Sequence, residues 1–153
     1  MNNLIIVKHA SGAPGLRLFG LGPNFLPKQG LIKLKSLLEQ NASWAKNRNI
    51  NDLKYMLSNS TVVVSLWKKS TLLGFGRATS DRIYRSVLWD IVVDSKYHNL
   101  GLGKVIVNTI LDNNLISNTE KIYLMTTNCK TFYSKMGFAH QENQTLMTFI
   151  KDK

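Results

Sequence analysis

The sequence predicts an α+β fold built on a mixed, mostly antiparallel sheet. Three apolar, β-branched segments at 61–67, 72–79 and 85–93 follow one another with short connections, which predicts an antiparallel meander. An apolar helical pattern over 102–114 and a buried strand pattern over 122–125 come next. Such a strand–helix–strand order predicts a right-handed crossover between parallel neighbours. The sheet is therefore expected to contain both kinds of pairing.

Two more segments complete the N-terminal half. Residues 1–14 are read as a peripheral extension or a short edge strand. Residues 16–19 (LRLF) alternate and predict a first strand, closed by the glycines and the proline that follow. Over residues 30–41, four leucines at helical spacing predict an amphipathic helix.

The connection after this helix contains Trp44 and Arg48, and Asn51 is expected to cap a second short helix over 52–57. The loop and its two helices could line a substrate entrance, with Trp44 at its edge. The alternative is that Trp44 packs under the loop.

The C-terminal part is predicted to hold a helix over 128–136, stopped by Gly137. Residues 138–140 and 145–150 are predicted to close the fold as a strand pair. The whole order is β-α-α-β-β-β-α-β-α-β-β, which gives about seven strands and about four helices.

Composition narrows the class of protein. A chain of 153 residues with 44% hydrophobic content fits a single domain over 1–153, in which 1–14 is peripheral. The sole cysteine, Cys129, excludes an intramolecular disulfide and favours a reducing compartment. No secretory signal, transit peptide or membrane-spanning run is expected from the apolar pattern.

The formal charge of +11 has two readings. One is a solvated lysine-rich surface, and the other is an acidic partner, either a polyphosphate cofactor or a nucleic acid. The charge is spread along the chain and no basic tract accompanies a nucleic-acid-binding motif. We therefore expect no nucleic-acid partner and no membrane partner.

The stretch from Leu88 to Lys104 is the strongest functional signal. An apolar strand leads through a glycine-containing turn, 99–103, into an apolar helix. Glycines let a ligand approach the main chain, and a helix N-terminus offers unpaired N–H groups and the positive end of its dipole. This stretch is predicted to hold the pyrophosphate of a cofactor.

Several motifs together resemble the GNAT (GCN5-related) N-acetyltransferases over roughly residues 30–150. They are the meander, the segment VVDSKYHNLGLGK that leaves it, the next strand, and FYSKMGF. In that family a Gln/Arg-x-x-Gly-x-Gly/Ala turn binds the pyrophosphate of acetyl-CoA, and here it stands as HNLGLG at 98–103. The segments GFGRATSD (74–81) and LWD (88–90) are similar to the cyanobacterial and plastid branch, which includes plant-type serotonin N-acetyltransferases and chloroplast lysine acetyltransferases.

The resemblance implies a sheet with splayed central strands and an enzyme that uses acetyl-CoA as acetyl donor. The acceptor is expected to be a primary amine, with an arylalkylamine such as serotonin or tryptamine as the main candidate. Alternatives are a protein lysine or N-terminal amine as acceptor, and a non-catalytic CoA-binding regulatory module. It further implies a plastid (organelle-encoded) or cyanobacterial-type cytoplasmic location, and a monomer or homodimer.

Cofactor contacts carry over residue by residue from the resemblance. The main chain of Ile91, Val92 and Val93 is expected to pair with the pantetheine arm. The remaining cofactor residues are His98, Asn99, Leu100, Gly101, Leu102, Gly103, Lys104, Asn128 and Tyr133. His98 stands where the family commonly has Gln or Arg, and Asn99 where it has Gly, although Asn tolerates positive φ.

Two residues are predicted to be catalytic. Asp90 is the candidate general base, because burial of a carboxylate in an apolar strand would raise its pKa. The alternative is a structural aspartate paired with Arg77 or another arginine. Tyr133 is the candidate acid for the leaving thiolate, with helix-to-sheet packing as its alternative.

For an aromatic acceptor, the residues available to form a flat slot are Trp44, Phe75, Tyr84 and Trp89. Cys129 has no His-Asp partner pattern and is expected to be inert. His9, His98 and His140 show no metal spacing, so we expect no metal.

Overall fold

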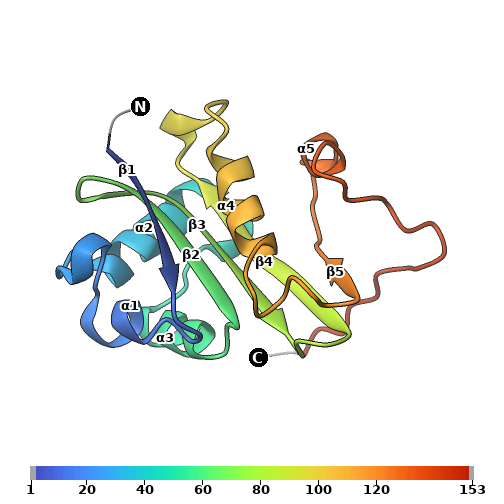
Figure 1. The fold of residues 1–153 in the computed structure, drawn as a ribbon, viewed down its shortest axis with the longest axis horizontal. Coiled ribbons are helices and arrows are strands. Elements are labelled where there is room, and N and C mark those ends of the chain that lie inside the picture. The colour runs from blue at the N-terminus through green and yellow to red at the C-terminus, as the bar shows by residue number, and fades with distance from the viewer. Residues whose placement is uncertain (1–2, 152–153) are drawn as a thin grey trace.

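A mixed sheet organises the protein. The computed structural model describes residues 3–151, and within them five strands form one sheet. They are β1 (Leu4–His9), β2 (Val62–Lys68), β3 (Thr71–Ser80), β4 (Arg85–Val93) and β5 (Lys121–Tyr123). The strands lie side by side in chain order; β1 to β4 are antiparallel, and β5 is parallel to β4 (Figure 1). The predicted α+β class with a mixed, mostly antiparallel sheet is confirmed.

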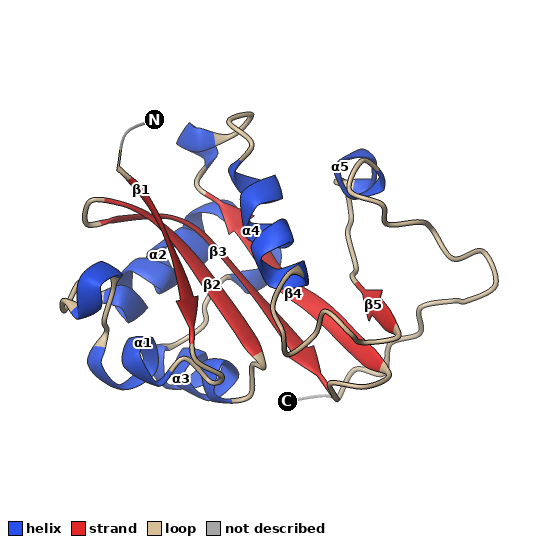
Figure 2. Ribbon diagram, in the orientation of Figure 1, coloured by secondary structure: helices blue, strands red, loops and turns tan. Residues whose placement is uncertain are grey.

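Helices cover both faces of the sheet (Figure 2). The α-helices of the described residues are α1 (Pro14–Phe19), α2 (Gly30–Asn41), α3 (Ile50–Ser58), α4 (Leu102–Leu111) and α5 (Lys130–Ser134). The first three pack on one face, where Trp67 and Phe75 are fully buried among their leucines. Helix α4 packs on the other face against Leu66 and Leu73. Because β2 is buried on both faces over 62–67, its sequence there is apolar except for the buried Ser65, rather than alternating.

The predicted strand at 16–19 is wrong, because these residues belong to α1. Pro14 stands at the start of that helix, where its fixed φ and missing N–H fit a first turn. Gly20 ends the helix with a φ of 62°, and its N–H donates to the Leu16 carbonyl at 3.0 Å. Four alternating residues are too few to distinguish a strand from one helical turn. The first strand is instead β1, at Leu4–His9, which pairs along β2 at the edge of the sheet. The reading of residues 1–14 as a short edge strand is thus confirmed for this part of the segment.

The predicted second short helix is present as α3, but its cap differs. The Asn49 side chain, rather than that of Asn51, accepts the Asp52 N–H at 2.8 Å. Trp44 lies in a short 3-10 turn (Ser43–Ala45) and is 60% exposed. It does not pack under the loop, and its place at the edge of a substrate entrance stays a prediction.

The predicted C-terminal strand pair is wrong, since residues 138–151 form no strand. With the error at 16–19 and the gain of β1, this leaves five strands instead of about seven in the described chain. The three-residue β5 offers only a short edge for a further strand. Leu146, Met147, Phe149 and Ile150 are consequently 70–88% exposed.

The splay expected between the central strands is visible in the pairing of β4 with β5. Residues 85–87 pair with 121–123, and beyond Val87 strand β4 continues to Val93 with no strand on that side. Strand β4 also contains a bulge, because Asp90 and Ile91 together stand opposite the single residue Gly76. No helix among residues 3–151 has the length and hydropathy needed to cross a membrane.

Candidate functional site

A cleft of about 550 Å³ opens where β4 separates from β5. It is lined by the end of β4, the loop that follows, the start of α4, and α5. Of the sequence-predicted site residues, the cleft brings together Ile91, Val93, His98, Asn99, Gly101, Leu102, Gly103, Lys104 and Tyr133. Sequence segments more than 30 positions apart therefore meet in one hollow.

The N-terminus of α4 faces this cleft without a side-chain cap. Gly101 precedes the helix with a φ of 77°, and the first turn contains no acidic residue. Its N–H groups and the positive end of the helix dipole are thus available to an anion, and Lys104 adds a cation beside them. Asn99 has a φ of 61°, so it adopts the left-handed conformation expected of it.

Gly103 lets α4 and α5 approach each other across the cleft. A Cβ at this position would lie 3.3 Å from Phe132 Cζ. That spacing is tighter than ordinary van der Waals contact, so a larger residue would push α5 away. Close packing against Phe132 therefore explains why the second glycine of the motif, Gly103, has no side chain.

His98 is exposed, and its ring also contacts the end of the strand. Its Nε2–H donates to the Val93 carbonyl at 3.0 Å, since a carbonyl can only accept. The ring thereby ties the loop after β4 to the end of that strand. This bond uses one of the two lone pairs of a main-chain carbonyl beside the cleft.

Three predicted cofactor residues lie outside the cleft lining. The Val92 side chain is buried on the opposite face of the sheet. Leu100 is 47% exposed. The Asn128 Oδ1 accepts from the Cys129 thiol at 3.4 Å, and Thr126 Oγ1 accepts the Cys129 N–H at 3.1 Å. Thr126 is therefore committed to the turn that precedes α5.

Tyr133 lies against two aromatic rings at the wall of the cleft. Its ring centroid is 4.9 Å from that of Phe132 and 5.9 Å from that of Phe138, both edge to face. Burial raises the pKa of Tyr133 to about 12, and the Cys129 thiol adds to the increase. The phenol is therefore fully protonated at neutral pH and can act as a hydrogen-bond donor.

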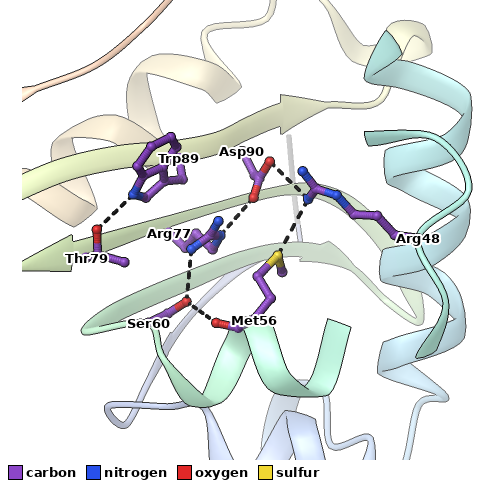
Figure 3. Close-up of polar contacts among 7 residues, drawn as sticks. All are labelled: Arg48, Met56, Ser60, Arg77, Thr79, Trp89 and Asp90. Carbon is purple, nitrogen blue, oxygen red and sulfur yellow. Dashed lines mark hydrogen bonds and ion pairs between the residues drawn. The ribbon is translucent and has the colours of Figure 1, made fainter. Parts of the chain in front are cut away.

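Asp90 is not among the residues that line the cleft, and its side chain lies in an ion cluster instead (Figure 3). Its side chain is 4% exposed. The Arg77 Nε donates to Oδ2 at 2.7 Å, and the Arg48 Nη1 donates to Oδ1 at 3.1 Å. The pairing with arginine that the sequence left as an alternative is present. Nothing in the sequence pattern places Arg48 beside Asp90, because 42 positions separate them.

The four aromatic residues considered for an acceptor slot do not form one. Phe75 is fully buried in the core, so its ring is not accessible to an acceptor. Tyr84 precedes β4, at the opposite end of that strand from the cleft, and is 60% exposed. Trp89 is partly buried and donates its indole N–H to Thr79 Oγ1 at 2.8 Å. Across the described part of the chain, no group of three or more His, Cys, Asp or Glu side chains could hold a metal ion.

Comparison with known proteins matches residues 58–140 to the family model described as Acetyltransferase (GNAT) domain. The chain is 34% identical over 113 residues to "Uncharacterized N-acetyltransferase ycf52" of Pyropia yezoensis, covering 71% of this chain and 64% of that protein. It is 30% identical over 103 residues to "Histone acetyltransferase TAP1" of Glycine max, covering 60% and 45%. The chain thus spans just under two thirds of the first relative and under half of the second.

Solved structures share the fold. A GNAT-family acetyltransferase from Streptococcus pneumoniae aligns with a TM-score of 0.72 at 19% identity, covering 98% of this chain and 99% of that one. Other relatives come from the cyanobacterium Prochlorococcus marinus and, as a protein named chloroplastic, from Arabidopsis thaliana.

Proposed function

Because this chain belongs to the GNAT acetyltransferase family, we propose that it is an acetyl-CoA-dependent N-acetyltransferase that acetylates a primary amine. The observation that carries the proposal is the uncapped N-terminus of α4, which faces a cleft that also contains Tyr133. An anion site and a proton donor in one cleft are what thioester chemistry on a phosphorylated carrier requires. Acetyl-CoA is the donor that members of this family use.

The cofactor residues divide into two groups. The turn from Asn99 to Lys104 would hold the pyrophosphate, through main-chain N–H groups, the helix dipole and the lysine. The end of β4, at 91–93, would receive the pantetheine arm, because the main chain on that edge has no neighbouring strand. The residues present therefore fit a polyphosphate carrier with an amide-containing arm.

Tyr133 is proposed as the general acid. Acetyl-CoA, when bound, supplies a thioester whose sulfur must leave as the amine nitrogen bonds to the acetyl carbon. The Tyr133 hydroxyl is protonated at neutral pH and lines the cleft, so it can give its proton to that sulfur. The proton lost by the amine needs a separate acceptor.

The general-base role proposed for Asp90 would require its ion pairs to change. Both of its carboxylate oxygens are engaged by arginines, so accepting a proton requires one arginine to be released. Neither oxygen lies in the cleft lining. The kinetics of Asp90→Asn distinguish a general base from an ion-pair partner.

Two acceptor classes follow from different observations. Arylalkylamines such as serotonin follow from the resemblance of the segments at 74–81 and 88–90. A protein amine is favoured by the relative named a histone acetyltransferase and by the failure of the four aromatic residues to form a slot. We also propose a plastid or cyanobacterial-type cytoplasm as the location, which the origins of the relatives support.

An acceptor panel read by mass spectrometry tests this proposal. The purified chain is incubated with acetyl-CoA and serotonin, tryptamine, tyramine, polyamines or lysine-containing peptides. Enzyme-dependent gain of one acetyl group on an amine is expected. Binding of acetyl-CoA without transfer to any amine would instead favour a regulatory module, and lack of binding would contradict both.

A further inference from the structure

Asp90 lies at a strained point of the main strand of the site. It forms the β4 bulge with Ile91, and its own φ is 51°, in the left-handed region. Residues with a Cβ rarely adopt this conformation, and it persists only where surrounding contacts determine it. Ile91 of the bulge lines the cleft, and so does Val93, two residues further along the strand.

The Asp90 side chain lies in the Asp90 cluster, which consists of Asp90, Arg48 and Arg77 (Figure 3). Each carboxylate oxygen has its own guanidinium, at 2.7 Å from Arg77 and 3.1 Å from Arg48. The arginine side chains are 13% and 29% exposed, respectively, so water screens these ion pairs only in part. Charge-assisted bonds of this kind are among the stronger polar contacts in proteins.

The two arginines come from different elements and are held in turn. Arg77, from β3, reaches Ser60 Oγ at 3.4 Å and lies over the Trp89 ring at 5.8 Å. Arg48, from the connection before α3, contacts Met56 Sδ at 3.5 Å. The cluster therefore joins β3, β4 and the two ends of the α3 region at one carboxylate.

We propose that Asp90 is a positioning residue, and that the Asp90 cluster fixes the β4 bulge and with it the 91–93 main chain beside the cleft. The inference rests on the proposed acetyl transfer for its kinetic consequence, but not for its structural one. Arg48 also belongs to the same connection as the exposed Trp44. The cluster thus ties the segment predicted to border a substrate entrance to the strand that would receive the cofactor.

The two-arginine arrangement makes a specific prediction about redundancy. Loss of one arginine leaves the carboxylate paired with the other. Loss of both leaves a carboxylate that is 4% exposed with no counter-charge, which costs far more than either single loss. The effects of Arg48→Met and Arg77→Met on the bulge should therefore be strongly non-additive.

Amide hydrogen exchange tests the structural part without any assay of activity. In the Arg48→Met/Arg77→Met double variant, exchange at Ile91 and Val92 should accelerate by more than about tenfold beyond the product of the single variants. Arg48→Met alone, at a partly exposed side chain, should fold and show a smaller acceleration. Arg85→Met is the matched control, because this β4 arginine pairs with an exposed Glu120. Unchanged protection at 91–92 in every variant, or equal changes in Arg85→Met, would overturn the proposal.

Kinetics of Asp90→Asn separate positioning from base catalysis. Asn keeps the shape and tolerates positive φ, but it loses the charge. Positioning predicts that KM for acetyl-CoA rises about tenfold, kcat falls less, and the acidic limb of the kcat/KM pH profile remains. A base predicts a kcat loss of about 10³-fold or more, unchanged KM and loss of that limb. If the wild type transfers acetyl to no amine, the proposed function fails. The exchange experiment still tests whether the Asp90 cluster fixes the β4 bulge.

Discussion

The proposed acid role of Tyr133 can be tested by a single substitution. Tyr133→Phe removes the hydroxyl, which is the proposed proton donor, while keeping the ring and its edge-to-face contacts. Burial raises the pKa of this hydroxyl to about 12, so it carries its proton at neutral pH. We expect kcat to fall about 10²-fold, with the Kd for acetyl-CoA within about twofold of wild type. Steady-state kinetics and calorimetry measure the two quantities.

A matched control for this variant is Tyr123→Phe on β5, which should leave kcat within about twofold of the wild-type value. A Tyr133→Phe enzyme with wild-type kcat would remove the acid role and leave packing as its function.

His9 gives the protein a pH-dependent stability. Burial lowers the pKa of His9 from 6.5 to about 4, and its Nε2 lies 2.7 Å from the Ser65 hydroxyl, which also accepts from the Trp67 indole. Between these two pH values the unfolded state binds a proton that the folded state does not. The contribution of His9 to the free energy of unfolding should therefore be constant above about pH 6.5 and fall by about 2–3 kcal/mol as the pH decreases toward 4.

Urea titrations across that pH window measure the effect. The His9→Gln variant should lose most of the slope, because Gln has no proton to bind. An equally steep dependence in the variant would assign the effect to other groups.

At the scale of elements, the N-terminus of α4 depends on Gly101. Its φ of 77° is strained for a residue with a Cβ, yet a Cβ there would meet no atom within 4 Å. Gly101→Ala should therefore cost about 1 kcal/mol through the backbone alone and lower Tm by about 2–4 °C. Acetyl-CoA binding should weaken along with it, as measured by calorimetry.

Gly101→Asn separates conformation from bulk, since Asn tolerates the left-handed region. It should retain more stability than the alanine variant despite its larger side chain. The reverse order would mean that steric crowding, not backbone conformation, makes glycine necessary there.

The elements long enough to repeat their hydrophobic pattern several times were predictable from the sequence, and the short elements were not. The leucines of α2, the three meander strands and α4 each repeat their pattern over several turns or pairs, so the pattern determines the element. Residues 16–19 are too few to show a repeated pattern. Pro14 at the start and Gly20 at the end favour the helix that the structure contains. The bulge at Asp90 has no local signature, because it depends on a register with β3 and on Arg48 from a distant connection.

At the scale of the whole molecule, the C-terminal segment is the main departure from expectation. Residues 145–150 are largely apolar, as a strand often is, but a strand needs a partner edge and β5 provides three residues. Nine of the fourteen residues that line the cleft were predicted as cofactor residues, mostly because a strand, a glycine turn and a helix are contiguous in the chain. The other five were not predicted, and four of them come from the α5 region: Tyr97, Cys129, Phe132, Lys135 and Met136. What sequence could not supply is which side chains line the cleft and which, like that of Asp90, do not.

A pair of phenylalanines tests how the molecule distributes its stability. Phe75 is fully buried and Phe149 is 86% exposed. Phe75→Ala should lower the free energy of unfolding by about 3–5 kcal/mol, and Phe149→Ala by less than about 0.5 kcal/mol. Denaturant titration compares the two, and a large loss in Phe149→Ala would show that the C-terminal segment packs as a strand after all.

The central claim is that the cleft between β4, α4 and α5 binds acetyl-CoA with its pyrophosphate at the α4 N-terminus. The most direct measurement is an NMR titration of the ¹⁵N-labelled protein with acetyl-CoA. We predict that the largest amide shift changes fall on Gly101, Gly103, Lys104 and the end of β4. Shift changes confined to other parts of the protein, or none at saturating acetyl-CoA, would contradict the claim.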